Sequence, residues 1–516
     1  MKKEKKGELL HMAAYGAADA AAGGANQIIG LYYFLFLTVV AGLGPLAAGV
    51  VTGIGRVWDG LIDPAMGIVV DRTRKKRGSV RFLMTIAVIP IAVAFFLLWN
   101  TSIIESGGVK SLLQLLGISG DVGKTVYFCF AYILWTTSYS LAVVPYDSLL
   151  PKIVPEYKTR TNYTVSRMIF SGIGGVSATY IYGWLIRVSE ENPLSPAFTD
   201  DFAVMSLVFG LIFAVFVLLT ALFVKEPSGL SKPAPERISL KVVFKSYADV
   251  LRCRTYRKFF GLVLSGAFIS SAVLTAMMMF VMLIYGDIES FIFTLSLSFL
   301  VVNVKGAIEI GFFVPNTIFM KKYNKHRPYF IDIPMLVAAA VIILFTGPDT
   351  PIWLFFVAMG LMGGGVSCLG FVPMALLPDL ADAQELISGK RSEGVNAGLN
   401  TFGKQVVGGV ATFIFGLILT LFGIGSTENL SPLTATPEKI WAVKIMFAVI
   451  PMLVCGLILW ISSSYKLDGK AHALIKRLVA ERRQDGSVNV SKDEKAVVEE
   501  ITGIAFDKMW IGGKDC

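Results

Sequence analysis

Charged residues are scarce in this chain. Asp, Glu, Lys and Arg together make up 16% of its 516 residues, whereas hydrophobic residues make up 54% and the mean hydropathy is +0.66. A soluble protein of this length needs a more polar surface, so the composition predicts a membrane protein with many spans. The net charge of +10 does not indicate a nucleic-acid partner, because the basic residues fall in short runs between apolar segments.

Cysteine and histidine are also few. The chain has five Cys and three His, and the cysteines show neither Cys-x-x-Cys spacing nor pairing with histidine. Their scarcity argues against a disulfide framework and against a metal cluster. No nucleophile–base pair and no phosphate-binding loop is apparent in the sequence, so we expect neither an enzyme nor a bound cofactor.

Long apolar segments follow one another along the whole chain. A spanning helix needs about 20 mostly apolar residues. Twelve segments meet this requirement: 12–40, 46–70, 82–100, 125–150, 165–187, 202–224, 258–285, 291–319, 328–347, 352–376, 395–424 and 438–463. They predict an all-α membrane protein made of an N-terminal six-helix bundle (1–224), a cytoplasmic linker (225–257) with an amphipathic helix near 239–252, a C-terminal six-helix bundle (258–463) and a cytoplasmic tail (464–516).

Basic residues are concentrated in alternate loops. The runs at 72–81, 152–160 and 321–327 fall on the same side as both ends of the chain, whereas the opposite loops hold few Lys or Arg. Positively charged loops stay in the cytoplasm during insertion. We therefore expect a multi-pass protein of the cell inner (plasma) membrane with both termini in the cytoplasm.

Two carboxylates interrupt the second apolar segment. Asp59 and Asp63 are four residues apart, so they share one face of a helix. An Asp at the middle of a membrane helix costs about 3 kcal/mol. In one interpretation the two carboxylates merely neutralise Arg56. In the other, Pro64 leaves the carbonyl of Gly60 without its helical donor, and the three groups together bind a proton or a small cation.

The residues around this pair resemble a known family. The stretch Trp58-Asp-x-x-x-Asp-Pro-x-Met-Gly67, followed by Asp71-Arg-Thr-Arg-x-x-Arg-Gly78, is similar to the signature of the glycoside–pentoside–hexuronide:cation symporters of the major facilitator superfamily. Further matches are Pro145-Tyr-x-Ser-Leu-x-Pro151 and Arg391-x-Glu-Gly394. The resemblance implies the major facilitator fold, in which twelve transmembrane helices form two six-helix bundles with the substrate between them.

The same resemblance implies a coupling site. Asp59 and Asp63 would carry the coupling ion, and Ser140 on the fourth helix would supply a hydroxyl. Family members that use sodium have an Asn just before the second Asp, where this chain has Ile62. Sodium prefers several oxygen ligands, whereas a proton needs only a carboxylate. H⁺ is therefore favoured, and Na⁺, with Asp59 and Asp63 as its ligands, stays open.

The expected substrate site differs from that of the family. The two Asp residues that bind sugar in the family align with Gly23 and Val143 of this chain. The side chains of Gly23 and Val143 cannot accept a hydrogen bond. Asp19 and Asp147 are the candidate replacements. Asp19 is alternatively a helix-end or solvated residue, and Asp147 a structural partner of Arg167, which itself matches an Arg that lines the family's cavity.

Five more candidates for substrate contact lie on two helices. Trp135 and Tyr139 are one turn apart and stack on a sugar ring in one interpretation, or pack in the core in the other. Asn396, Asn400 and Lys404 share a helix face in the C-terminal half. The resemblance implies a lysine on that helix, and a gap of one residue is needed to match it to Lys404.

Two further charged groups have competing explanations. By family analogy Asp71, Arg72 and Arg77 form a cytoplasmic gate, although a basic run here also suits simple orientation in the membrane. Lys305 and Glu309 are four residues apart within an apolar segment. They either neutralise each other, or Lys305 recognises an acidic sugar.

These observations lead to one functional hypothesis and one alternative. The chain is expected to be a monomeric symporter that carries a sugar or glycoside across the lipid bilayer together with H⁺ or Na⁺. The missing sugar-binding Asp residues and the Ala- and Gly-rich first helix suit a lysolipid or another amphipathic substrate instead. A channel is less favoured, because it would not need a buried carboxylate pair.

Overall fold

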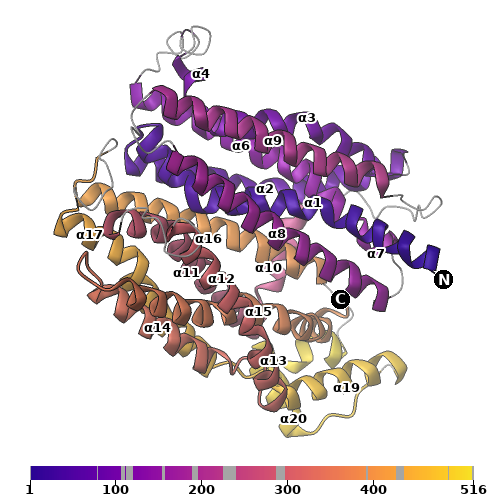
Figure 1. The fold of residues 1–516 in the computed structure, drawn as a ribbon. Coiled ribbons are helices and arrows are strands. Elements are labelled where there is room, and N and C mark those ends of the chain that lie inside the picture. The colour runs from indigo at the N-terminus through magenta and orange to yellow at the C-terminus, as the bar shows by residue number, and fades with distance from the viewer. Residues whose placement is uncertain are drawn as a thin grey trace. The chain divides into compact units, whose positions relative to one another are not determined.

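The computed structural model describes residues 2–77, 79–105, 111, 120–153, 157–188, 196–224, 240–285, 297–390, 393–425, 435–485 and 487–513 (Figure 1). Every regular element within these ranges is a helix. The all-α prediction is therefore confirmed for the described part of the chain.

Six long helices fill the N-terminal part. Four of them, with a short π-helical continuation of the first, are α1 (Lys2–Leu35) with η1 (Phe36–Val40), α2 (Pro45–Arg77), α3 (Arg81–Leu98) and α6 (Gly120–Asp147). The last two are α8 (Tyr157–Val188) and α9 (Pro196–Phe223), and the short helices α4 (Ser102–Glu105) and α7 (Leu150–Ile153) lie between the long ones. The six long helices correspond to the first six predicted spans.

The C-terminal part repeats this pattern. The amphipathic helix expected near 239–252 is found as α10 (Leu240–Val250). The spans that follow are α11 (Arg254–Ile284), α12 (Leu297–Gly311) with α13 (Phe313–Lys322), α14 (Tyr329–Phe345), α15 (Ile352–Ser388), α16 (Glu393–Leu421), and α17 (Pro437–Lys444) with η3 (Ile445–Val449) and α18 (Ile450–Ser463). The tail contains α19 (Gly469–Asp485) and α20 (Lys492–Thr502), then the turns η4 (Phe506–Lys508) and η5 (Trp510–Gly512).

Nine helical segments of the described chain are long and apolar enough to cross a membrane. The other three predicted spans are helical but differ in character. α2 and α8 are more polar, and α14 has only 17 residues. The twelve predicted spans are thus all present as helices.

Contacts along the chain define two compact units. The first unit comprises Met1–Ile238, Leu274–Leu300 and Gly409–Val443, and the second comprises Ser239–Val273, Val301–Gly408 and Lys444–Cys516. These two units are groups of residues that lie close together in this conformation. They do not identify the groups of helices that move together during transport. The boundaries at 224, 257 and 463 therefore remain predictions.

Helix α1 lies against α8 in the first unit. The two helices approach closely at Gly23, where an added Cβ would be 2.9 Å from the carbonyl carbon of Ser171 in α8. An Asp side chain therefore cannot stand at Gly23 unless the helices separate. Helix packing thus gives a physical reason why this position differs from the family's pattern.

Candidate functional site

The α2 carboxylates form a polar site with α6. Asp59 and Asp63 are half-buried, and the buried Ser140 of α6 donates a hydrogen bond of 2.7 Å to Oδ1 of Asp63. Asp59 lies within electrostatic reach of both Asp63 and Arg56. Three residues that the sequence groups as the coupling site are therefore close together in the first unit.

A second polar bond joins the same two helices. The indole N–H of Trp58 donates to Oγ1 of Thr137 at 2.9 Å. Thr137 is not among the residues predicted from the sequence, although it lies three residues before Ser140 and so on the same side of α6. Helix α2 can lie this close to α6 because Gly55 faces the ring of Tyr132, where a Cβ would be only 2.5 Å from a ring carbon. These contacts fix the position of the α2 carboxylates.

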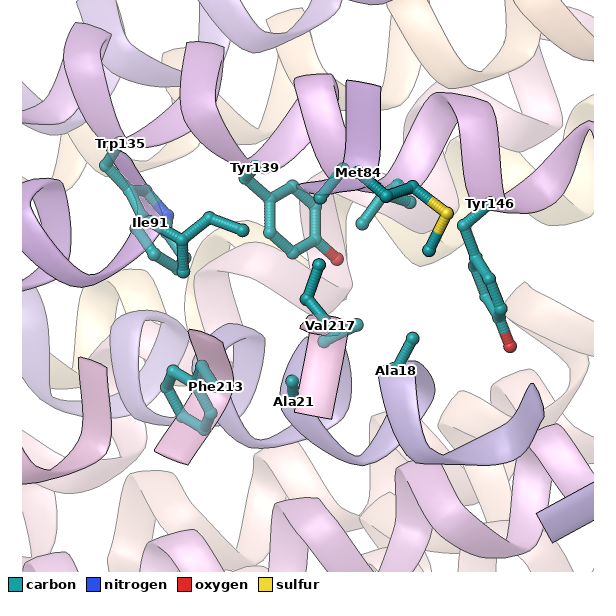
Figure 2. Close-up of a pocket in the computed structure, with 12 residues that line it drawn as sticks. Ala18, Ala21, Met84, Ile91, Trp135, Tyr139, Tyr146, Phe213 and Val217 are labelled. Atoms are coloured by element: carbon teal, nitrogen blue, oxygen red, sulfur yellow. The ribbon is translucent and has the colours of Figure 1, made fainter. Parts of the chain in front are cut away.

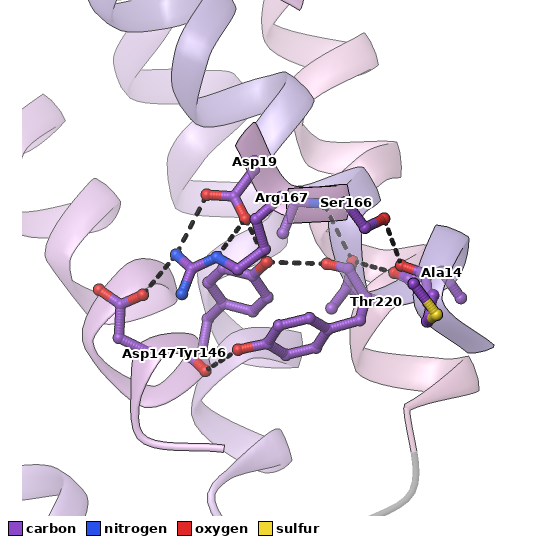
Figure 3. Close-up of polar contacts among 10 residues, drawn as sticks. Ala14, Asp19, Tyr146, Asp147, Ser166, Arg167 and Thr220 are labelled. Atoms are coloured by element: carbon purple, nitrogen blue, oxygen red, sulfur yellow. Dashed lines mark hydrogen bonds and ion pairs between the residues drawn. The ribbon is translucent and has the colours of Figure 1, made fainter. Parts of the chain in front are cut away.

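Arg167 of α8 is the centre of a network that joins α1 and α6 (Figure 3). Its guanidinium bonds both oxygens of Asp19, at 2.5 and 3.1 Å, and reaches Oδ1 of Asp147 at 2.6 Å. The hydroxyl of Tyr146 contacts Asp19 and donates to the carbonyl of Tyr15 at 2.8 Å. Both proposed hydroxyl acceptors are thus bound to one arginine, which is the structural alternative considered for Asp147.

Tyr146 was not among the sequence candidates. Its ring also lies under the Arg167 guanidinium, 4.6 Å from the ring centroid. The signal that was available is its position in the Pro145-Tyr-x-Ser motif, next to Asp147. With two carboxylates and one guanidinium, the network has a net charge of −1 when all three groups are ionised.

Trp135 and Tyr139 differ in their surroundings. Trp135 is only 3% exposed and packs against Phe95 with ring centroids 5.1 Å apart. Both aromatic residues line a cavity of about 20 Å³ whose other walls are mainly apolar (Figure 2). A cavity of this size holds about one water molecule and no sugar. Trp135 is thus packed among apolar side chains, whereas the Tyr139 hydroxyl accepts a 3.0 Å hydrogen bond from Asn26.

The three candidates on α16 belong to the second unit and are not equivalent. The hydroxyl of Tyr256 lies 3.2 Å from the carbonyl of Asn396 and 3.3 Å from Oδ1 of Asn400, and both Asn residues are buried. Lys404 is exposed. Among the described residues it forms no hydrogen bond or ion pair, so it is the α16 candidate whose charge is accessible to a ligand.

The remaining charged candidates lie at helix ends and on α12. Asp71 is half-buried and Arg72 exposed on the last turns of α2, while the side chain of Arg77 lies outside the described residues. Lys305 and Glu309 form an ion pair of 2.8 Å on α12. This contact is the mutual neutralisation considered for them.

Comparisons with known proteins agree on the kind of molecule. A family model described as MFS/sugar transport protein matches residues 14–469. The putative glycoside/cation symporter YagG of Escherichia coli (strain K12) is 23% identical, over 92% of this chain and 95% of its own. The sodium-dependent lysophosphatidylcholine symporter 1-B of Danio rerio is also 23% identical, over 89% of this chain and 87% of its own.

A solved structure supports the fold. The crystal structure of the nucleoside transporter NupG superimposes with a TM-score of 0.58 at 12% identity, covering 88% of this chain and 98% of that one. Similarity at this level of identity concerns the fold alone.

Proposed function

The chain belongs to the MFS/sugar transport protein family, whose model matches residues 14–469, and from this premise we propose that it is a cation-coupled symporter of a sugar or glycoside. Membership confirms the predicted major facilitator fold and a multi-pass membrane transporter of a small molecule. The alternate basic loops support placement in the plasma membrane with both termini in the cytoplasm. We propose that the monomer is the transporting unit.

One observation carries the coupling proposal. Asp63 is held by a hydroxyl at 2.7 Å, with a second carboxylate one turn away at Asp59. A neutral hydroxyl orients a carboxylate without cancelling its charge. An ion that binds there removes negative charge from a membrane-embedded site, so the transporter can close around a loaded site at a lower cost than around an empty one. Binding of the ion and closure are thereby coupled.

The residues at this site favour a proton over sodium. The oxygens come from two carboxylates and one hydroxyl, and Ile62 stands where family members that use sodium supply an amide. A small hard cation takes about six or more oxygen ligands, so it would need further oxygens from the backbone or from water at this site, whereas one carboxylate suffices for a proton. Sodium is the alternative, with the carbonyl of Gly60, whose helical N–H donor Pro64 cannot supply, as an added ligand.

The polar groups of the first unit support a hydroxylated substrate. Asp19 and Asp147 keep acceptor lone pairs beyond those that bind Arg167, and Asp147 has a side chain that is 54% exposed. A sugar hydroxyl can donate to such an oxygen without breaking the ion pair. Lys404 on α16 provides an accessible donor. We propose that Asp147 contacts the substrate and that Asp19 and Arg167 position Asp147; the role of Lys404 in the second unit stays a prediction.

An amphipathic lipid is the second candidate substrate. The positions that bind sugar in the family hold Gly23 and Val143, and Val143 lines the apolar cavity of Figure 2. The relative from Danio rerio is named as a lysophosphatidylcholine symporter. The apolar residues at the sugar-binding positions and the name of this relative together favour an amphipathic lipid among the substrates that are not sugars.

A binding screen separates the two candidates. The purified full-length protein is heated with a panel of monosaccharides, glycosides and lysophospholipids, with and without Na⁺ and at two pH values. A ligand that binds the folded state raises the melting temperature. We expect a glycoside to do so more strongly at the lower pH; stabilisation by lysophospholipids alone would favour the second candidate, and no response to any sugar would contradict the first.

A further inference from the structure

A buried carboxylate that the coupling proposal does not use lies in the second unit. Asp332 is in the first turn of α14 and has no exposed surface. Two polar side chains, Asn316 of α13 and Ser367 of α15, are buried with it. Three helices therefore meet at one small polar cluster inside an otherwise apolar region.

Two side-chain hydrogen bonds converge on one oxygen of Asp332. The amide N–H of Asn316 donates to Oδ2 of Asp332 at 2.7 Å, and the hydroxyl of Ser367 donates to the same oxygen at 3.0 Å. Asn316 also donates to Ser367 at 2.7 Å, which closes the triangle. The other oxygen, Oδ1, is buried without a hydrogen-bond partner among the residues that the structure describes.

No positive charge compensates Asp332 within the described chain. Among the basic side chains of the neighbouring elements, Lys325 binds Asp379 and Lys444 binds the carbonyl of Leu344. Lys321, Lys322 and Arg327 are exposed, and the buried His326 contacts the ring of Tyr465. The titratable groups that face this region are neutral phenols and thiols. They are Tyr329 on α14, Cys368 on α15, Cys455 on α18 and Tyr465 after it.

An ionised Asp332 would therefore be a buried charge with only neutral donors around it, which are Asn316, Ser367 and the backbone N–H and thiol of Cys368, and with no counter-charge. Such a charge costs several kcal/mol, at about the scale of a broken buried ion pair. A proton on Oδ1 removes that cost and leaves Oδ2 as a carbonyl-type acceptor for both donors. A metal ion does not fit as well, because Asn316 and Ser367 direct hydrogens and not lone pairs towards the carboxyl group.

We propose that Asp332 carries a proton on Oδ1 and is a protonation site separate from the α2 carboxylates. The sign of its effect on stability follows. An unfolded Asp releases its proton above about pH 4, whereas the folded protein keeps it, so unfolding releases a proton. The stability that Asp332 contributes must then fall as pH rises above that value. A variant with a neutral amide at this position lacks that decline.

Infrared difference spectroscopy of the purified full-length protein tests the assignment directly. A protonated carboxyl group has a C=O stretching band that a carboxylate lacks. We expect this band at neutral pH to be lost in Asp332→Asn and kept in Asp349→Asn, which changes an exposed Asp in a loop. Loss of a carboxylate band instead, or a band that moves when Na⁺ is added, would overturn the proposal.

Two further measurements extend the test, and the first of them does not depend on the folding of Asp332→Asn. Ser367→Ala keeps the carboxyl group and removes one donor from Oδ2, so the C=O band must shift to higher frequency. An unshifted band would contradict the assignment. Where Asp332→Asn does fold, its melting temperature must fall less than that of the wild type as pH rises from 5 to about 8; parallel curves would also refute it.

Discussion

Two groups of carboxylates in the first unit have opposite environments. Asp19 and Asp147 share the guanidinium of Arg167, with side chains that are 14% and 54% exposed. Asp63 is instead held by the neutral hydroxyl of Ser140, and no ion pair joins it to a residue in the described ranges. The guanidinium balances one of the two negative charges of the first group, whereas Asp63 has no ion-pair partner among the described residues and keeps a charge that a bound ion can neutralise. The difference separates the network that we propose to position the substrate from the site that we propose to bind the coupling ion.

The strongest way to break this comparison is to remove the charge of Asp63. We expect Asp63→Asn to reduce concentrative uptake at least tenfold, equivalent to about 1.4 kcal/mol, while exchange down a gradient continues. The measurement is uptake into proteoliposomes with and without an imposed ion gradient. Asp349→Asn is the control. Full accumulation by Asp63→Asn would remove the coupling role.

Loss of charge in the arginine network should instead affect stability. Asp19→Asn removes a carboxylate that binds Arg167 through two oxygens in a mostly buried setting, and we expect it to lower the free energy of unfolding by about 2 kcal/mol. Asp147 is more exposed, so Asp147→Asn should lower the free energy of unfolding by less than about 1 kcal/mol. Melting temperatures of the two purified variants, compared with the wild type, give the order. Equal losses would show that exposure does not distinguish the two carboxylates.

Ser140 tests whether the hydroxyl matters for the bound ion. Ser140→Ala should change the ion concentration needed for half-maximal uptake about five- to tenfold, close to 1 kcal/mol. For H⁺ the change is towards tighter binding, because the lost hydrogen bond had stabilised the ionised carboxylate of Asp63; for Na⁺ it is towards weaker binding, because an oxygen ligand is lost. The matched control is Ser138→Ala, whose hydroxyl bonds the carbonyl of Leu134 within the same helix at 2.7 Å. The ion dependence of initial uptake rates is the readout. Identical shifts in both variants would point to a general effect on α6.

The smallest expected effect concerns the second α2–α6 contact. Trp58→Phe loses the 2.9 Å bond to Thr137 but keeps most of the ring, so the cost should be about 1 kcal/mol or less. Thr137→Val should produce the same shift in melting temperature, and the double variant no more than either one. Additive losses would show that the two side chains do not act through this bond.

The spans illustrate what hydropathy alone can locate. The prediction of 46–70 found the apolar part of α2, but the helix continues to Arg77 through the basic run. Likewise α15 extends from Ile352 to Ser388, beyond the predicted 352–376. Hydropathy reports where a helix is apolar, whereas hydrogen bonding within the backbone carries the helix on through polar residues that lie outside the bilayer.

By itself, the sequence determined the helical membrane fold and the pairing of Asp59 with Asp63, because apolar length and a spacing of four residues depend only on local helix geometry. Tertiary structure decided the rest. It joined Asp19 and Asp147 to Arg167 and Asp332 to Asn316 and Ser367, and it buried Trp135 against Phe95. Those contacts join different helices. Their partners depend on how closely the helices pack, which no spacing along one helix can specify.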